Sequence, residues 1–232
     1  MFECEAEGLR ALRAAGVRTP EPYAHGIRGG QAFIEMERLD LGGAPDWPAM
    51  ARMLAQLHRH QSPQYGWPRD NWIGLAPQRN ALHSDWAEFF RDYRLAPQLE
   101  TARANGHAVD ASRLLQGVAA FFADYRPAAS LLHGDLWGGN AGFLRDGAPV
   151  IYDPAVYYGD READLAMTEL FGGFGGEFYA AYREAWPLDS GYLVRRDLYN
   201  LYHVLNHLNL FGAGYLRQAQ TMVGKLEAEL QA

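Results

Sequence analysis

The sequence contains very little of two residue types that carry chemistry, cysteine and lysine. Its 232 residues include one cysteine, Cys4, and one lysine, Lys225. A single cysteine cannot form an intrachain disulfide, so we expect Cys4 to be a buried or partly buried thiol in a reducing compartment. No apolar run approaches the roughly 20 residues that span a bilayer. These absences exclude a disulfide scaffold and predict a cytoplasmic protein without membrane segments.

Positive charge is also scarce. Lysine and arginine total 21 against 28 acidic residues, which gives a formal net charge of -7. A nucleic-acid surface needs clustered basic residues, and no long basic run is present, so a nucleic-acid partner is excluded. The remaining composition, 48% hydrophobic and 13% aromatic, is that of a folded protein with a sizeable core. The length allows one large domain or two lobes, and the oligomeric state is left open.

Hydrophobic spacing predicts a mixed protein in which helices outnumber strands. The expected helices cover residues 1–15, 48–58, 84–99, 111–125, 162–171, 177–186, 191–211 and 214–232. Two strands should flank the turn at 28–30, and the second, 32–36, is apolar enough to be buried. Residues 62–80 should form a loop. The Asp146-Gly147 pair predicts a hairpin of strands 141–144 and 150–152.

His58 and His60 stand at the end of one expected helix. They are two residues apart, which differs from the i, i+4 spacing of a helical zinc pair. We therefore expect a loop or surface position for both.

The stretch LLHGDLWGGN, residues 131–140, places polar groups in a glycine-rich loop. Asp135 is followed five positions later by Asn140, and the expected hairpin then leads to Asp153 in IYDPA. Protein kinases space a catalytic Asp and a metal-binding Asn in the same way, with a second metal ligand after a short strand pair. Each residue alone is typical of a turn, but their order together favours phosphoryl transfer. We expect His133 and Asp164 to hold this loop by hydrogen bonds.

These blocks resemble the fructosamine kinase (ketosamine-3-kinase) family. HGDxxxxN marks the broad group that includes aminoglycoside phosphotransferases and choline kinases, whereas HGDLWGGN and DPAVYYGDREADLAM are more specific. MFECEAEGLRAL, DNWIGLAPQ, SDWAEFFRDYRLAPQL and LYHVLNHLNLFGAGY are also similar to the family's sequences. The resemblance implies an α+β, protein-kinase-like fold: a truncated small first lobe, residues 1–39, and a mainly helical second lobe, residues 40–232, with the catalytic loop and metal-binding hairpin.

The resemblance also implies roles in nucleotide binding and chemistry. Asp135 would be the catalytic base, and Asn140 and Asp153 would hold Mg²⁺ on the phosphates of ATP. Glu5 would be the helix glutamate that pairs with a phosphate-binding lysine. Residues 37–39, that is Glu37, Arg38 and Leu39, would be the hinge that offers backbone groups to adenine.

On the acceptor side, the resemblance implies that Trp137 packs on the sugar of the substrate and that Asp85, Trp86 and His207 border the substrate cleft. The implied reaction is ATP-dependent phosphorylation of a sugar hydroxyl on a ketoamine, either a small molecule or a glycated protein lysine. The phosphorylated adduct would then break down and free the amine, which is protein deglycation or repair.

The family's first lobe begins with strands that carry a glycine-rich turn and the lysine that meets Glu5. This sequence starts at the helix, and its only lysine is Lys225. The segment GGFGGEF, residues 172–178, does not replace that turn, because Phe178 stands where G-x-G-x-x-G needs glycine. We expect exposed apolar surface at this lobe, and either a misplaced start codon or a degenerate kinase.

Two further functions stay open at this point. One keeps the fold and changes the acceptor to an aminoglycoside or another small alcohol. The other is a non-catalytic binding protein that has lost its first-lobe strands and does not bind Mg-ATP.

Overall fold

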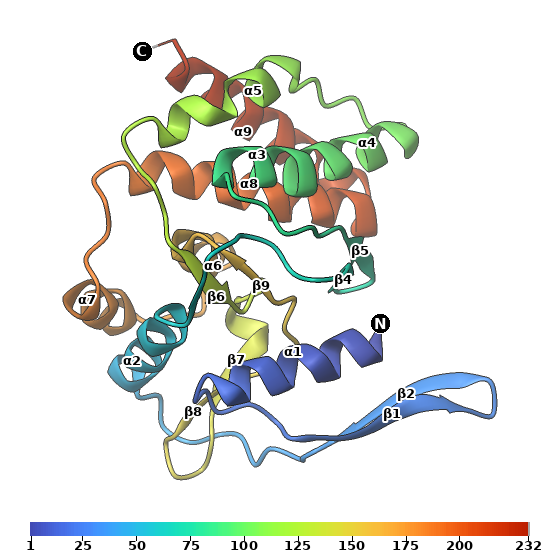
Figure 1. The fold of residues 1–232 in the computed structure, drawn as a ribbon, viewed down its shortest axis with the longest axis vertical. Helices are drawn as coiled ribbons and strands as arrows, with labels where there is room; N and C mark the ends of the chain where they lie inside the picture. Colours follow the sequence, from blue (N-terminus) through green and yellow to red (C-terminus); the bar gives the residue numbers. More distant parts are fainter. Residues whose placement is uncertain (232) are drawn as a thin grey trace.

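The structure is a computed structural model that describes residues 1–231. Its α-helices are α1 (Phe2–Ala14), α2 (Trp47–His58), α3 (Trp86–Phe90), α4 (Ala96–Ala104), α5 (Ser112–Gly117), α6 (Arg161–Leu170), α7 (Gly176–Ala185), α8 (Tyr192–Phe211) and α9 (Leu216–Glu229). Its strands are β1 (Pro22–Arg28), β2 (Gln31–Met36), β3 (Gln61–Ser62), β4 (Asn71–Ile73), β5 (Ala76–Gln78), β6 (Ala129–Leu132), β7 (Ala141–Phe143), β8 (Pro149–Ile151) and β9 (Tyr157–Gly159). Helices and short strands thus give the mixed class that the sequence predicts (Figure 1).

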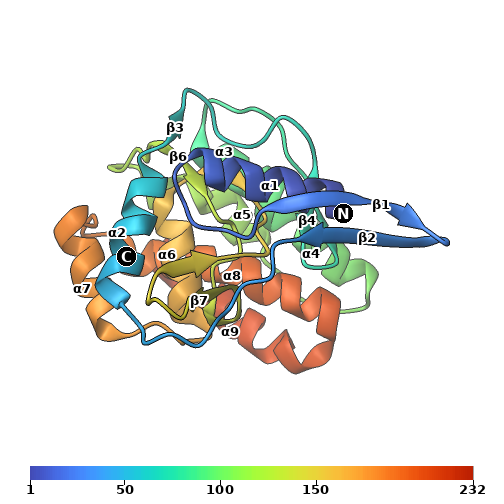
Figure 2. The ribbon, with the colours of Figure 1, turned by 90° about the horizontal axis from the view of Figure 1, so that it is seen from below.

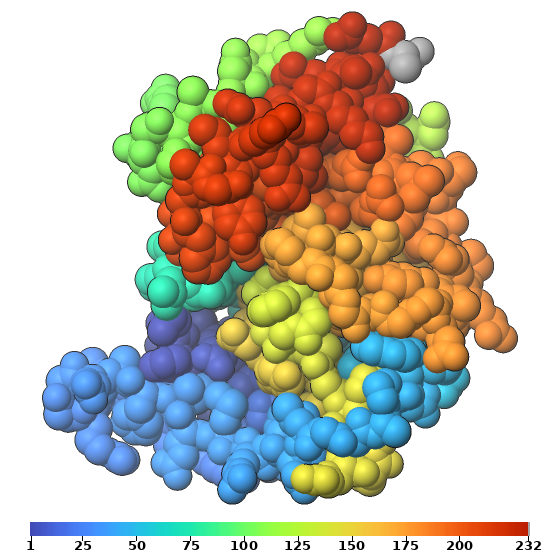
Figure 3. All heavy atoms as spheres, turned by 180° about the vertical axis from the view of Figure 1, so that it is seen from behind, coloured from blue at the N-terminus to red at the C-terminus, as the bar shows by residue number. Residues whose placement is uncertain are grey.

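The first helix and the strand pair that follows it differ in burial. α1 buries Ala6, Leu9 and Leu12 on one face at helical spacing. β1 and β2 pair as an antiparallel hairpin that projects from the body (Figures 2 and 3). The prediction of a buried strand at 32–36 is wrong, because every residue of β2 is exposed or only half-buried. The hairpin has no second layer of the described residues against most of its length, so its apolar side chains stay partly or fully in solvent.

Exposed apolar residues occur in the first lobe, as predicted, but also elsewhere, for example at Leu193 and Phe211 of α8. The relative exposure of Ile27 is 78%, of Tyr23 59%, and of Leu75, in the β4–β5 turn, 72%. Cys4 is a free, partly buried thiol on α1, as expected.

The other strands are short and lie inside the body. β6 pairs with both β3 and β9, and all four residues of β6 are buried. β7 and β8 pair around the Asp146-Gly147 turn, which confirms the predicted hairpin. The segment expected to be a loop, 62–80, contains the β4–β5 hairpin. Short strands of this kind escape sequence reading because three residues show no clear period.

Two expected helices are more irregular than the sequence suggests. The first runs from α3 through a π-helical turn, Arg91–Leu95, directly into α4. The second is α5 followed by a 3-10 turn, Val118–Phe122. α8 is the long central helix of the larger part, where it packs against α4, α6 and α9 (Figure 1).

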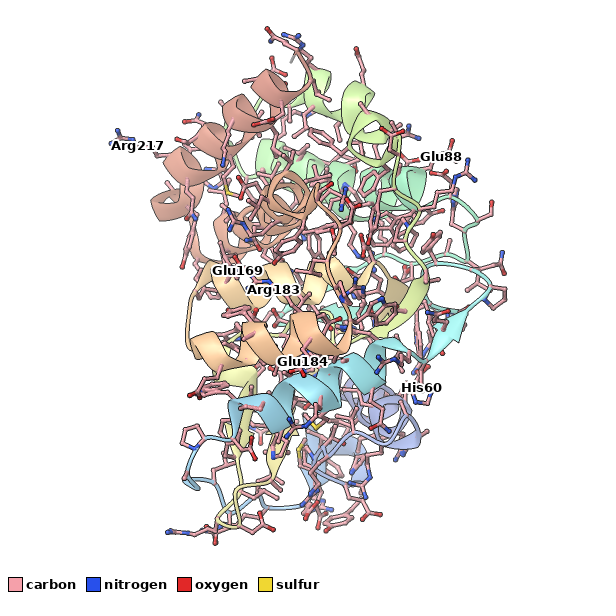
Figure 4. The ribbon with its side chains drawn as sticks, turned by 90° about the vertical axis from the view of Figure 1, so that its left-hand side faces the viewer. His60, Glu88, Glu169, Arg183, Glu184 and Arg217 are labelled. Atoms are coloured by element: carbon pink, nitrogen blue, oxygen red, sulfur yellow. The ribbon has the colours of Figure 1, made fainter. Side chains whose placement is uncertain are left out.

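α2 and α7 lie side by side, although the 117 residues from 59 to 175 separate them in the chain (Figure 4). His60 is exposed just beyond α2, as predicted. His58 is fully buried, so the prediction of a loop or surface position is wrong for it. Its ring lies between Tyr182 of α7 and Asp164 of α6, at 2.7 and 3.2 Å.

One hydrophobic core joins the early and late parts of the chain. Leu12 and Val17 belong to the same buried cluster as Leu205 of α8 and Leu226 of α9. The predicted boundary between two lobes, at residues 39 and 40, therefore stays a prediction. It does not separate two hydrophobic cores. No helix in the described part of the chain is both long and apolar enough to cross a membrane.

Candidate active site

The loop that follows β6 is held against the segment after Asp153 by close backbone contacts. The amide of Ala155 donates to the carbonyl of His133 at 2.8 Å. Gly134 has a φ of +83°, and a Cβ at this position would lie 2.1 Å from the carbonyl oxygen of Ala155. Only glycine combines that backbone conformation with that approach. The two loops therefore meet because residue 134 has no side chain.

Asp164 of α6 also holds the loop that follows β6. Its carboxylate accepts hydrogen bonds from the amides of His133 and Gly134, at 2.8 and 2.9 Å. Burial opposes its ionisation, but the hydrogen bond and charge of His58, with the other donors, hold the pKa of Asp164 below its usual value. The His133 ring contacts the Tyr152 carbonyl at 3.0 Å. The predicted loop-holding contacts of His133 and Asp164 are both present.

The structure brings Asp135, Asn140 and Asp153 together. The Asn140 Nδ2 lies 2.9 Å from the Asp135 carbonyl oxygen, 3.3 Å from Asp135 Oδ2 and 3.4 Å from the Asp153 carbonyl oxygen. A 3-10 turn, Gly138–Asn140, and the β7–β8 hairpin produce this proximity. The sequence order of the three residues thus becomes a compact cluster of oxygen-bearing side chains.

Asp153 has the backbone strain that often accompanies function. Its φ is +57°, and it is the only non-glycine with positive φ among residues 1–231. Such a conformation costs on the order of 1–3 kcal/mol and persists where surrounding contacts impose it. Here the neighbouring peptide is held by the bond between Ala155 and His133. The strained backbone sets the direction in which the Asp153 carboxylate leaves the chain.

Asn140 and Asp153 offer donors that suit Mg²⁺. The hydrogen bonds of the Asn140 side chain within the described residues all use Nδ2, which leaves Oδ1 for another partner. Mg²⁺ takes oxygen ligands and usually only one or two from the protein, with water and phosphate oxygens completing the shell. One amide oxygen and one carboxylate beside a base fit that requirement.

Asp135 lies in surroundings that disfavour its charge. Burial, together with the carboxylates of Asp153 and Asp164, raises the pKa of Asp135 to about 7. A carboxylate whose pKa lies near the working pH is suited to accept a proton from a substrate hydroxyl. Asp135 therefore combines a position and a basicity suited to proton transfer.

A hollow of about 350 Å³ joins Asp153 to the first turn of α1. It is lined by Met1, Phe2, Glu5, Trp72, Gly74, Leu75, Asp153 and Pro154. α1 approaches closely because a Cβ on Gly8 would already lie 3.1 Å from Cγ of Pro154. Burial, and then repulsion by Asp153, raises the pKa of Glu5 to about 7. Across the described residues neither acid forms an ion pair with Arg or Lys. The charge of the Met1 amino group lowers the pKa of Glu5 but does not cancel its rise, so this hollow still suits a cationic occupant.

The three hinge residues do not line that hollow. The amide of Glu37 donates to the Glu21 carbonyl at 2.8 Å, and its carboxylate binds Arg18 at 2.6 and 2.7 Å. That hydrogen bond with Arg18 is the main reason why the pKa of Glu37 is lowered. Arg38 is exposed and Leu39 half-buried. Their contact with adenine stays a prediction, and the Glu37 side chain has a structural role here.

Trp137 and His207 lie in one row of aromatic rings beside the catalytic loop. The Trp137 ring, 40% exposed, meets Phe171 edge-on at 6.3 Å between ring centroids. Phe171 in turn lies 4.7 Å from the ring of His207. The row offers an apolar surface next to Asp135, which suits the predicted contact with a sugar.

Asp85 and Trp86 are not brought to this cluster. Asp85 caps α3 by accepting from the Glu88 amide at 2.8 Å, and Trp86 is buried with its indole N–H on the Tyr199 hydroxyl at 3.0 Å. Both line a separate hollow that includes Tyr65 and Tyr125 and none of the clustered acids. Their substrate contact stays a prediction, while their visible roles are a helix cap and core packing.

Several residues that support the site escaped sequence reasoning. Asn71 and Gln78 donate to the carbonyls of Val156 and Ala155, at 2.8 and 3.1 Å, and so fix the segment after Asp153. Both residues lie in the segment expected to be a loop, 62–80. Their role is visible only from the hydrogen bonds to residues about 80 positions later in the chain.

Arg94 is a second such residue. It is fully buried in the π-helical turn, with its guanidinium 4.0 Å from the ring centroid of Tyr157. It also donates to the Asn80 side chain at 2.8 Å. A charged residue in a helix usually faces solvent, so the sequence contains no signal for this position.

Comparisons with known proteins agree with this geometry. The family model described as fructosamine kinase matches residues 1–229. A probable ketoamine kinase of Synechocystis sp. is 48% identical over 228 residues, covering 96% of this chain and 77% of the relative. A chloroplastic protein-ribulosamine 3-kinase of Oryza sativa subsp. indica is 44% identical, covering 96% of this chain and 68% of the relative.

Solved structures give the same result. A protein assigned as a fructosamine-3-kinase from Haemophilus somnus superposes with a TM-score of 0.91 at 32% identity, covering 97% of this chain and 79% of that one. A choline/ethanolamine kinase family protein from Mesorhizobium loti, at 16% identity and a TM-score of 0.59, shares the fold alone. The match over nearly the whole chain, with the clustered Asp135, Asn140 and Asp153, shows that this chain belongs to the fructosamine kinase family.

Proposed function

We propose that this protein uses ATP to phosphorylate the C3 hydroxyl of a ketoamine, a fructosyl or ribulosyl adduct of lysine. The observation that supports this most directly is the cluster of Asp135, Asn140 and Asp153, which unites a base with two oxygen ligands. The names of the relatives, ketoamine kinase and protein-ribulosamine 3-kinase, support the acceptor class. In this chain Asp135, Asn140 and Asp153 would carry out the chemistry of the family.

The proposed transfer needs one proton acceptor and precise placement. Asp135 accepts the proton of the C3 hydroxyl as that oxygen bonds to the γ-phosphorus of ATP. The bond from the γ-phosphorus to the β,γ-bridging oxygen breaks, and ADP leaves with the electron pair. Because the pKa of Asp135 is raised, its carboxylate is a stronger base than an exposed aspartate.

Asn140 and Asp153 would hold Mg²⁺ on the phosphates, and bound Mg²⁺ supplies charge neutralisation there. The rigid contacts of the two loops keep these side chains in place before substrate binds. Glu5 lines the same hollow as Asp153. A basic group or metal bound there would offset the repulsion between the two carboxylates.

Trp137 would pack on the sugar ring or chain, and His207 would border the same surface. The phosphorylated adduct would then break down and free the amine. The acceptor is a small ketoamine or a glycated lysine on a protein.

The test is transfer of labelled phosphate from Mg-ATP to a ribulosyl-lysine peptide. We expect Asp135→Asn to abolish transfer while the protein keeps its far-ultraviolet circular dichroism. Asp146→Asn is the matched control, because Asp146 is an exposed carboxylate at the tip of the neighbouring hairpin. Equal turnover by wild type and Asp135→Asn would contradict the proposed base.

An acceptor panel tests the substrate. Preference for an aminoglycoside over ribulosyl-lysine and fructosyl-lysine would replace the proposed acceptor with an antibiotic. Absence of Mg-ATP binding by calorimetry, together with no transfer to any acceptor, would favour a binding protein.

A further inference from the structure

His203 of α8 faces the proposed base with a ring nitrogen that has no protein partner. Within the described residues its Nδ1 is buried and makes no hydrogen bond, and it lies 4.0 Å from Asp135 Oδ1. The side chain is only 5% exposed. Buried polar atoms are nearly always satisfied, so an orphaned nitrogen that faces an active carboxylate calls for a ligand.

The contact between His203 and Asp135 is not an ion pair. Burial, and then the nearby His207 ring, lowers the pKa of His203 to about 3, so the imidazole is neutral at ordinary pH. The separation of 4.0 Å also exceeds the length of a hydrogen bond. The two atoms do not bond to each other, and they are close enough for one oxygen-bearing group to contact both.

The surroundings hold this ring in place without satisfying Nδ1. The ring meets Tyr202 edge-on at 5.1 Å between centroids, and the Tyr202 hydroxyl is fixed by Gln78 at 2.9 Å. The His207 ring nitrogen binds the His203 carbonyl oxygen at 2.9 Å. The neighbours of the ring are thus bonded, while Nδ1 faces Asp135 with no partner among the described residues.

A ketoamine offers two oxygens at a matching spacing. Its C2 oxygen and C3 hydroxyl stand on neighbouring carbons, about one hydrogen-bond length apart. If the C3 hydroxyl binds Asp135, the C2 oxygen can lie against a donor a few ångströms from that carboxylate. A neutral imidazole with its proton on Nδ1 is such a donor.

We propose that His203 donates a hydrogen bond from Nδ1 to the C2 oxygen of the ketoamine while Asp135 accepts the C3 hydroxyl. His203 is then a specificity residue that recognises the oxygen next to the reacting hydroxyl. This inference rests on the proposed function, because it places the acceptor of that reaction.

Two acceptors and two variants test it. Ribulosyl-lysine carries the C2 oxygen, and its 2-deoxy pentitylamine analogue keeps the C3 hydroxyl but has only hydrogen at C2. His203→Leu keeps the packing volume and removes the donor. His203→Asn keeps an amide near the position of Nδ1. Thermal melts show whether each variant is folded.

We expect His203→Leu to lower kcat/KM for ribulosyl-lysine roughly ten-fold, as expected for one lost hydrogen bond in a site, and His203→Asn to restore most of it. With the 2-deoxy analogue, wild type and His203→Leu should have the same kcat/KM within about two-fold. If His203→Leu does not fold, His203→Gln takes its place, since its amide reaches the Nε2 position and leaves Nδ1 unreplaced.

The outcomes separate this inference from the proposed function. An equal loss with both acceptors would mean that His203 only supports the fold, and would overturn the inference while ketoamine phosphorylation stands. Full activity of a folded His203→Leu on ribulosyl-lysine would overturn it in the same way. A wild-type protein that phosphorylates no ketoamine would overturn both.

Discussion

Two hairpins of this protein have similar pairing and opposite surroundings. β7 and β8 pair antiparallel over three positions and bury Val150 and Ile151, whose relative exposures are 0% and 1%. β1 and β2 pair over a longer register, yet Ile27 is 78% exposed. Strand pairing alone therefore does not position chemistry. The β7–β8 hairpin positions Asn140 and Asp153 because the core and two loops hold it.

The two sides of the proposed site also differ in how well their surroundings hold them. The acceptor side, around Asp135 and His203, is enclosed by hydrogen-bonded loops and α8. The hollow between Glu5 and Asp153 is lined by these two acids and by no arginine or lysine. Substitutions near the catalytic loop should therefore have large effects, and substitutions in the projecting hairpin should have small ones.

After the loss of transfer expected for Asp135→Asn, the next largest effect is expected at Asp153. We expect Asp153→Asn to lower turnover at least roughly 100-fold, since even outer partners of a bound metal change affinity or activity ten- to a hundred-fold. The Mg²⁺ concentration for half-maximal activity should rise as well. Measurement of transfer against Mg²⁺ concentration checks this, and an unchanged magnesium dependence would remove Asp153 from the proposed metal site.

Alanine substitution of two glycines with positive φ, one in the catalytic loop and one in the β1–β2 turn, compares the stability of the two regions. A Cβ at Gly134 would overlap the Ala155 carbonyl, whereas a Cβ at Gly29 in the β1–β2 turn meets nothing within 4 Å. We expect Gly134→Ala to lower the free energy of unfolding by about 3 kcal/mol or more, through both strain and overlap. Gly29→Ala should cost only about 1 kcal/mol, from strain. Urea unfolding measures both, and equal losses would contradict the close approach of the two loops.

The raised pKa of Asp135 predicts a pH-dependent stability without magnesium. The folded protein binds this proton up to its pKa of about 7, whereas the unfolded chain releases it near the ordinary aspartate pKa of 3.8. Stability from this group is therefore lost as pH rises between these values. Asp135→Asn should be more stable than wild type at pH 8 by about 1–2 kcal/mol and equal to it at pH 3, below both pKa values. Thermal melts in chelator at both pH values check this, and equal stability at pH 8 would contradict a raised pKa.

The smallest effect is expected at the projecting hairpin. Ile27→Val should change the free energy of unfolding by less than about 0.5 kcal/mol, because the side chain stays in solvent. Ile151→Val, the matched change in the buried hairpin, should cost about 0.5–1.5 kcal/mol. A larger loss at position 27 than at 151 would show that β1–β2 is covered in solution.

Much of the site could be predicted because its residues are close in the sequence. Asp135, Asn140 and Asp153 lie within 19 positions, and a glycine-rich loop with an Asp-Gly turn defines their local path. The helix periods of α1 and α2 are equally clear, since each buries one face. α8 is different, because every residue from 198 to 206 is buried. Local spacing and hydrophobic period carry this information without reference to the rest of the chain.

The supporting residues could not be found in this way. His58, Arg94 and Gln78 are polar and read as surface or loop residues, yet each is buried against a segment far away in the chain. The apolar strand at 32–36 is expected to be buried, but the described fold covers it only in part, and its side chains are exposed or half-buried. Whether a side chain is buried depends on what packs against it, which a local pattern does not contain.

The resemblance to the family, the order of Asp135, Asn140 and Asp153, and most helices follow from the sequence without the fold. The left-handed backbone of Asp153, the raised pKa of Asp135 and the open nitrogen of His203 exist only in the folded chain. The last two arise where distant segments exclude water and bring like charges or unsatisfied atoms together. Desolvation and charge proximity depend on three-dimensional distance, and only the folded chain sets that distance.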